Sequence, residues 1–118
     1  MRAIIGKVGK SRVLESEMKR LNKEEVLLVD TVGVHAISSL ALWQVNPKSY
    51  TELIALFEKF ESIEEFKDIK YVVLELNTRI EEVDVLLNWE RKLKRNFIVT
   101  IQDNETDRTL MVDMTLPQ

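Results

Sequence analysis

Residues 3–30 of the chain, AIIGKVGKSRVLESEMKRLNKEEVLLVD, predict a strand, a loop, a helix and a second strand in that order. The apolar stretch 3–5 stops at Gly6, and Gly9 follows before a regular pattern resumes. From Ser11 onward, apolar residues recur at helical spacing, namely Leu14, Met18 and Leu21. The unbroken apolar run 26–29 is typical of a strand covered on both faces, as in parallel sheets. This stretch therefore predicts a β-α-β unit.

The chain beyond this unit predicts further helices, starting near residue 46. Asn46 is expected to cap a helix that has Pro47 at its first position, and an apolar stripe follows. Ser62 and Glu65 have the spacing of a capping box, which predicts a short helical piece over 63–66.

Two more buried strands are expected, over 71–76 and 97–101, because both runs are almost entirely apolar. Between them, Thr78 and Glu81 have capping-box spacing and predict the start of another helix. The segment 31–45 predicts no single structure, since a helix over its middle and an edge strand at its end are both compatible with its pattern.

The last predicted strand, residues 110–114, alternates apolar with polar or exposed positions. Only residues 102–107 separate the expected strand 97–101 from this one, and a parallel crossover needs about ten residues or more. We therefore expect the last strand to return antiparallel, as a hairpin. The sequence as a whole predicts one domain over 1–118, an α/β three-layer sandwich with a mainly parallel sheet and an antiparallel C-terminal edge strand.

The composition excludes several classes of site and partner. The 118 residues carry a net charge of -3 and no cysteine, which excludes disulfides, thiolate nucleophiles and cysteine metal sites. His35 is the only histidine, and we interpret it as structural. The net negative charge indicates contact with nucleic acid only through an assembly. No apolar run is long enough to cross a bilayer and no secretory signal pattern is present, so we expect a cytoplasmic protein without a membrane partner.

The segment Gly6-Lys7-Val8-Gly9-Lys10-Ser11 lies between a predicted strand and a predicted helix, as a phosphate-binding loop does. Small residues allow consecutive backbone N–H groups to point at a phosphate, the helix N-terminus adds partial positive charge, and a lysine adds a full one. The candidate cofactor-binding residues are therefore Gly6, Gly9, Lys10 and Ser11. The same residues are also compatible with a plain tight turn.

These residues resemble the Walker A motif of P-loop NTPases, and more narrowly that of FtsK- and HerA-type motors, in a shortened form. The resemblance implies that Lys10 contacts a phosphate and that Ser11 is a metal ligand. The strand 71–76 takes the place of the Walker B strand, which implies that Glu75 holds the metal through water. Gln102 takes the place of the polar sensor residue and would contact the terminal phosphate. Glu75 and Gln102 are thus the candidate catalytic residues, and ATP or another nucleotide with Mg²⁺ is the implied cofactor.

The leading hypothesis is a P-loop-like domain that binds a nucleotide or another phosphate-bearing ligand, with weak or lost NTP hydrolysis, as an assembly or regulatory module. One alternative is a non-enzymatic interaction domain, for example a homo-oligomer, that associates through the apolar edge 110–114. Another is a phospho-switch, because 26–30, Gly33-Val34 and 37–40 are similar to the switch region of STAS domains.

Overall fold

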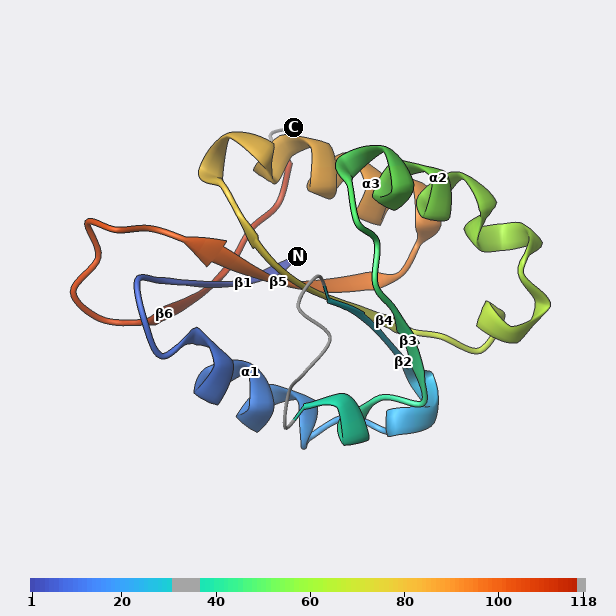
Figure 1. The fold of residues 1–118 in the computed structure, drawn as a ribbon, viewed down its shortest axis with the longest axis horizontal. Helices are drawn as coiled ribbons and strands as arrows, with labels where there is room; N and C mark the ends of the chain where they lie inside the picture. The colour runs from blue at the N-terminus through green and yellow to red at the C-terminus, as the bar shows by residue number, and fades with distance from the viewer. Residues whose placement is uncertain (31–36, 117–118) are drawn as a thin grey trace.

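The computed structural model describes residues 1–30 and 37–116, and a single six-stranded sheet forms its centre. The strand order is β3-β2-β4-β5-β1-β6 (Figure 1). The first five strands of this order run parallel, and β6 is antiparallel at one edge. The strands are β1 Arg2–Gly6, β2 Val26–Asp30, β3 Trp43–Val45, β4 Tyr71–Thr78, β5 Asn96–Gln102 and β6 Leu110–Asp113.

Helices cover both faces of this sheet, with α2 and α3 on one face and α1 on the other (Figure 1). The predicted fold class, an α/β three-layer sandwich with a mainly parallel sheet and an antiparallel edge strand, is therefore confirmed. The α-helices are α1 Lys10–Met18, α2 Tyr50–Lys59 and α3 Val83–Leu93. Short 3-10 segments complete the connections, namely η1 Lys23–Glu25, η2 Ser38–Leu40, η3 Phe60–Ser62, η4 Glu64–Phe66 and η5 Ile80–Glu82.

The core has two parts, one on each face of the sheet. The larger cluster includes residues of α2 and α3, and its aromatic rings pack closely: the centroids of Phe57 and Phe97 lie 5.6 Å apart. The smaller cluster joins the sheet to Leu14 and Met18 of α1. Alternate residues of each central strand contribute to opposite clusters. Burial on both faces explains why these strands are continuous apolar runs in the sequence.

The expected helix starts after residue 45 were partly wrong. Helix α2 begins at Tyr50, three residues later than Pro47, because Ser49 is the cap: its hydroxyl accepts a hydrogen bond from the Glu52 N–H at 3.1 Å. Thr78 is the last residue of β4 rather than a cap, and α3 follows only after η5. The short helical piece expected over 63–66 is the 3-10 segment η4.

The ambiguous segment 31–45 ends in an edge strand, β3, which was one of its two expected structures. Residues 31–36, which include Gly33 and His35, lie outside the described part of the chain.

The last strand is antiparallel as predicted, but its neighbour is β1 and not β5. Both edges of β5 are already paired, with β4 on one side and β1 on the other. The chain therefore crosses past β1 after Gln102 and adds β6 at its far edge, with Ile5 opposite Leu110 and Arg2 opposite Asp113.

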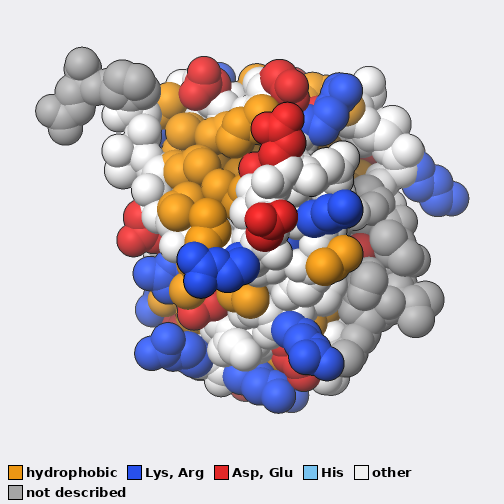
Figure 2. Space-filling view, turned by 90° about the vertical axis from the view of Figure 1, so that its left-hand side faces the viewer, with side chains coloured by type: hydrophobic (Ala, Val, Ile, Leu, Met, Phe, Trp, Pro, Cys, Tyr) orange, Lys and Arg blue, Asp and Glu red, His pale blue; other side chains and the backbone are white. Residues whose placement is uncertain are grey.

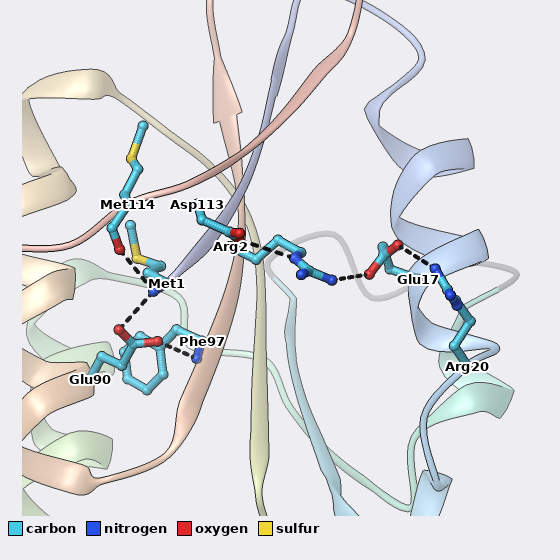
Figure 3. Close-up of polar contacts among 8 residues, drawn as sticks. All are labelled: Met1, Arg2, Glu17, Arg20, Glu90, Phe97, Asp113 and Met114. Carbon is cyan, nitrogen blue, oxygen red and sulfur yellow. Dashed lines mark hydrogen bonds and ion pairs between the residues drawn. The ribbon is translucent and has the colours of Figure 1, made fainter.

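Polar contacts connect the start of β1 to the end of β6 and to two helices, at the amino ends of the parallel strands (Figure 3). The ammonium of Met1 lies 3.0 Å from a carboxylate oxygen of Glu90 on α3 and donates to the Met114 carbonyl. Arg2 donates to Glu17 at 2.8 Å and to Asp113 at 3.3 Å, and these hydrogen bonds raise its pKa. The contacts join β1, α1, α3 and the end of β6.

Within residues 1–30 and 37–116, no helix combines the length and the apolar character that crossing a membrane requires.

Candidate functional site

The carboxyl ends of β1, β5 and β4 lie side by side, because β5 is placed between the other two strands. In sheets of this kind ligands bind beyond these ends, where the chain turns into helices. The structure thereby brings Gly6, at the end of β1, opposite Gln102, at the end of β5. Glu75 lies on β4, the next strand along. Three candidate residues that are far apart in the sequence thus lie at one edge of the sheet.

Lys10, the first residue of α1, turns its side chain inward and is only 6% exposed. Its Nζ donates to the carbonyl of Gly6 at 2.9 Å, to the carbonyl of Lys7 at 3.2 Å and to Oε1 of Gln102 at 2.7 Å. An ammonium group has three N–H donors, so these three oxygens match its capacity. The lysine is therefore fixed in the turn rather than extended into solvent.

Burial lowers the pKa of Lys10, because desolvation disfavours the charged ammonium. The negative charge of Glu75 opposes this effect and raises the pKa. Glu75 is 8% exposed and its Oε1 accepts a hydrogen bond from the Thr100 hydroxyl at 3.0 Å. The site therefore combines a buried cation with a buried carboxylate near it.

Gln102, the last residue of β5, makes hydrogen bonds through both the oxygen and the nitrogen of its side-chain amide. Besides accepting from Lys10, it donates from Nε2 to the Lys7 carbonyl at 3.3 Å and to Asn104 Oδ1 at 2.8 Å. A single side chain thus connects the β1–α1 turn with the loop that follows β5.

That loop, residues 103–109, packs directly on the turn. The amide of Asp103 donates to the Gly6 carbonyl at 3.1 Å, and the hydroxyl of Thr109 donates to the Val8 carbonyl at 2.8 Å. A Cβ added to Gly6 would lie 2.9 Å from Thr109 Oγ1, which is too close for an undisturbed contact. Glycine at this position therefore permits the close approach of the loop.

Gly9 is the cap residue of α1 and has a φ of 86°, in the left-handed region that favours glycine. No side chain caps the helix at this end, and the first N–H groups of an α-helix have no intrahelical acceptor. Ser11, the second residue of α1, is exposed beside these groups. The helix therefore presents N–H donors and partial positive charge next to Lys10.

Asp30, at the end of β2, pairs in register with Glu75 and is also buried. The two carboxylates lie on neighbouring strands and on the face of the sheet that α1 covers, since Leu28 and Val73, two residues earlier in each strand, pack against α1.

Sequence reasoning identified Lys10 and Gln102 but missed Thr100 and Thr109. Thr100 carries a usable signal, because it is the one polar residue inside the apolar run 97–101. Thr109 carries none, since its role depends on how the loop folds back over the turn.

Comparison of the chain with protein-family models, with curated proteins and with solved structures found no match.

Proposed function

We propose that the chain binds a phosphate group of a small ligand, such as a nucleotide, at the β1–α1 turn, with weak or no hydrolysis. The observation that supports this most is the buried ammonium of Lys10, held by Gln102 at the mouth of α1. Burying a lysine costs solvation free energy, and an apolar side chain would fill the same space without that cost. Perturbed buried charges of this kind are concentrated at functional sites.

In the proposed complex a phosphate oxygen replaces the Lys7 carbonyl, which is the longest of the three contacts of Lys10. The N–H groups at the start of α1 donate to the remaining phosphate oxygens. The anion thereby offsets the desolvation of the ammonium, and the helix N-terminus favours its negative charge.

The turn fits one phosphate group better than a wrapped triphosphate chain. Only Lys7 and Val8 separate the two glycines, and Thr109 lies against both: a Cβ on Gly9 would be 3.3 Å from its hydroxyl oxygen. This crowding supports ligand binding without efficient hydrolysis, in a regulatory or assembly module. If Mg²⁺ accompanies the ligand, the residues we assign to it are Ser11 and, through water, Glu75.

The order of elements also supports the resemblance to P-loop NTPases. A strand, a glycine-containing turn and a helix are followed by strands that bring an acidic residue, Glu75, and a polar residue, Gln102, to the same edge.

A thermal-unfolding series tests the proposal with inorganic phosphate and with ATP, each with and without Mg²⁺. A ligand at 100 times its Kd stabilises the native state by about 2.7 kcal/mol, which raises Tm measurably. We expect the ligand-induced shift in the wild type and in Lys23→Ala, which removes an exposed lysine of η1 outside the turn. We expect it to be lost in Lys10→Ala, when each variant is compared with its own ligand-free Tm.

An equal shift in Lys10→Ala, or no shift in any protein, would show that the turn is structural only. Release of phosphate from ATP is measured in parallel, and the expected rate in the wild type is close to that of Lys10→Ala.

A further inference from the structure

β6 forms one outer edge of the sheet, and among the strands of the described residues only β1 lies beside it. The opposite edge is β3, which is only three residues long. An edge strand exposes a row of backbone N–H and C=O groups that can pair with another strand. The longer edge, β6, is therefore the place where the sheet can be extended.

The hydrogen bonds to β1 determine which groups of β6 point outward. Met1 and Met114 exchange both of their backbone hydrogen bonds, at 3.0 Å and 2.8 Å. Hydrogen-bonded and non-hydrogen-bonded pairs alternate along an antiparallel ladder. In the observed register Val112 and Leu110 therefore bond to β1, whereas the backbone groups of Met111 and Asp113 point away from it.

The side chains of β6 leave this edge unprotected. Leu110 is 46% exposed and Met111 is 45% exposed, on opposite faces of the sheet. The sequence Leu-Met-Val-Asp contains neither lysine nor proline, which commonly block such edges. Its one charged residue, Asp113, is held by Arg2 (Figure 3).

Apolar side chains are also exposed on the surface of the molecule, two of them on β6. Figure 2 shows hydrophobic side chains gathered in one area in the upper left of that view, with acidic side chains above and to its right. The exposed apolar residues of the strand itself are Leu110 and Met111. Apolar surface beside an open strand edge is typical of a protein interaction site.

We propose that β6 pairs antiparallel with β6 of a second copy of this chain, about a two-fold axis at Met111. The two six-stranded sheets then form one continuous sheet. In this register Met111 lies opposite its own counterpart, and the outward backbone groups of the two residues form a reciprocal hydrogen-bonded pair. Leu110 lies opposite Val112 of the second copy on the other face, which places apolar against apolar.

Neighbouring registers are less favourable because of charge. Moving the axis to Leu110 would place Asp113 opposite Asp107, and moving it to Asp113 would place that carboxylate opposite itself. An axis at Val112 would place Met111 opposite Asp113 of the second copy. Only the axis at Met111 keeps every apolar residue of β6 opposite an apolar one.

We assign the partner strand to β6 of a second copy, because β6 itself has the features that a strand needs in order to pair with this edge. The partner strand must offer outward backbone groups at alternate residues, apolar side chains on both faces, and no carboxylate opposite Asp113. The proposal uses none of the contacts of Lys10, so it can fail or succeed independently of phosphate binding.

A cysteine crosslink tests both the association and its register. The chain contains no cysteine, so Met111→Cys introduces a single thiol. Opposite residues of a hydrogen-bonded pair have Cα atoms about 5.5 Å apart, which a disulfide can bridge. We expect oxidation to convert most of this variant to a covalent dimer. Leu42→Cys is the matched control, because Leu42 is 53% exposed but lies outside β6.

Sedimentation equilibrium of the cysteine-free protein completes the test. The wild type and Leu42→Lys should show a dimer that dissociates on dilution, whereas Met111→Lys should remain monomeric with an unchanged circular dichroism spectrum. A monomeric wild type at all concentrations would overturn the proposal. So would crosslinking of Met111→Cys no greater than that of Leu42→Cys, or dimerisation of Met111→Lys equal to that of the wild type.

Discussion

Lys10 donates a hydrogen bond of 2.7 Å to Gln102, although 92 residues separate them in the sequence. The contact connects the first residue of α1 to the last residue of β5. It exists because β5 lies between β1 and β4, so that Gln102 at the carboxyl end of β5 is next to the carboxyl end of β1, from which the turn leads to Lys10. The candidate site is thus a consequence of the strand order and not of the turn sequence alone.

The buried charge of Lys10 predicts a dependence of stability on alkaline pH. Because burial lowers the pKa of Lys10 below 10.5, the unfolded chain binds more protons at this residue than the folded chain does between the two pKa values. The contribution of Lys10 to the free energy of unfolding must therefore rise with pH between its pKa in the folded chain and its pKa in the unfolded chain. Lys10→Met removes the titrating group while keeping a side chain of similar length.

Urea unfolding of the wild type and Lys10→Met, from neutral pH to 10.5, measures this effect. The difference between the two should shift in favour of the wild type as pH rises, because the other titrating groups are the same in both proteins. A difference that is flat, or that moves toward Lys10→Met, would contradict the prediction.

Gln102→Glu separates the structural role of Gln102 from a role in ligand binding. The new carboxylate can still accept a hydrogen bond from Lys10 and pairs more strongly with its charge. It also repels an anion next to α1, so we expect a smaller Tm shift with phosphate than in the wild type. In Gln102→Ala the loss of the amide contacts should destabilise the fold by about 1–3 kcal/mol.

The measurements are phosphate-dependent thermal unfolding for both variants and urea unfolding without ligand. If Gln102→Glu responds to phosphate as strongly as the wild type does, Gln102 does not lie beside the anion.

The fold could be predicted from sequence to the level of its elements. The apolar runs of β2, β4 and β5 are covered on both faces, so their pattern is strong. The partner of β6 could not be predicted, because pairing with β1 depends on which strand edges are already occupied. The helix start at Tyr50 was misplaced because Asn46-Pro47 and Ser49 both carry cap signals, and the hydroxyl of Ser49 is the one that reaches an N–H group of α2.

The sequence predicted which residues would make up the candidate site, but not the contacts that these residues make. Gly6, Gly9 and Lys10 stood out through their spacing and their position before a helix. The covering loop could not be foreseen, because the contacts of Asp103 and Thr109 with the turn depend on the tertiary path between β5 and β6.

Gly6→Ala tests whether the loop 103–109 packs on the turn as closely as the structure indicates. The added Cβ would lie 2.9 Å from Thr109 Oγ1 and 3.2 Å from Thr109 Cα, so either the loop or β1 must shift. We expect a loss of about 1–3 kcal/mol in the free energy of unfolding. Thr109→Ala in the same chain removes the nearer atom and should recover part of that loss.

A double-mutant cycle by urea unfolding measures the coupling between Gly6→Ala and Thr109→Ala, expected at about 0.5 kcal/mol or more. Gly9→Ala is a useful comparison, because its cost should come mainly from the positive φ, at about 1 kcal/mol. Strict additivity of Gly6→Ala and Thr109→Ala would mean that the loop does not contact the turn in solution.

Glu90 provides the last prediction, because one carboxylate serves two partners at the amino ends of the strands (Figure 3). Its Oε2 accepts the Phe97 N–H at 2.8 Å, and its Oε1 lies 3.0 Å from the Met1 ammonium. Glu90→Ala leaves both without this acceptor and should lower the free energy of unfolding by about 1–3 kcal/mol. Glu90→Gln keeps an oxygen for the amide but loses the charge, so its loss should be smaller. Urea unfolding measures both variants and a control, Glu64→Ala, which removes an exposed ion pair with Lys67 and should change the free energy of unfolding by about 0.5 kcal/mol or less. An equally small effect of Glu90→Ala would show that the shared carboxylate contributes little.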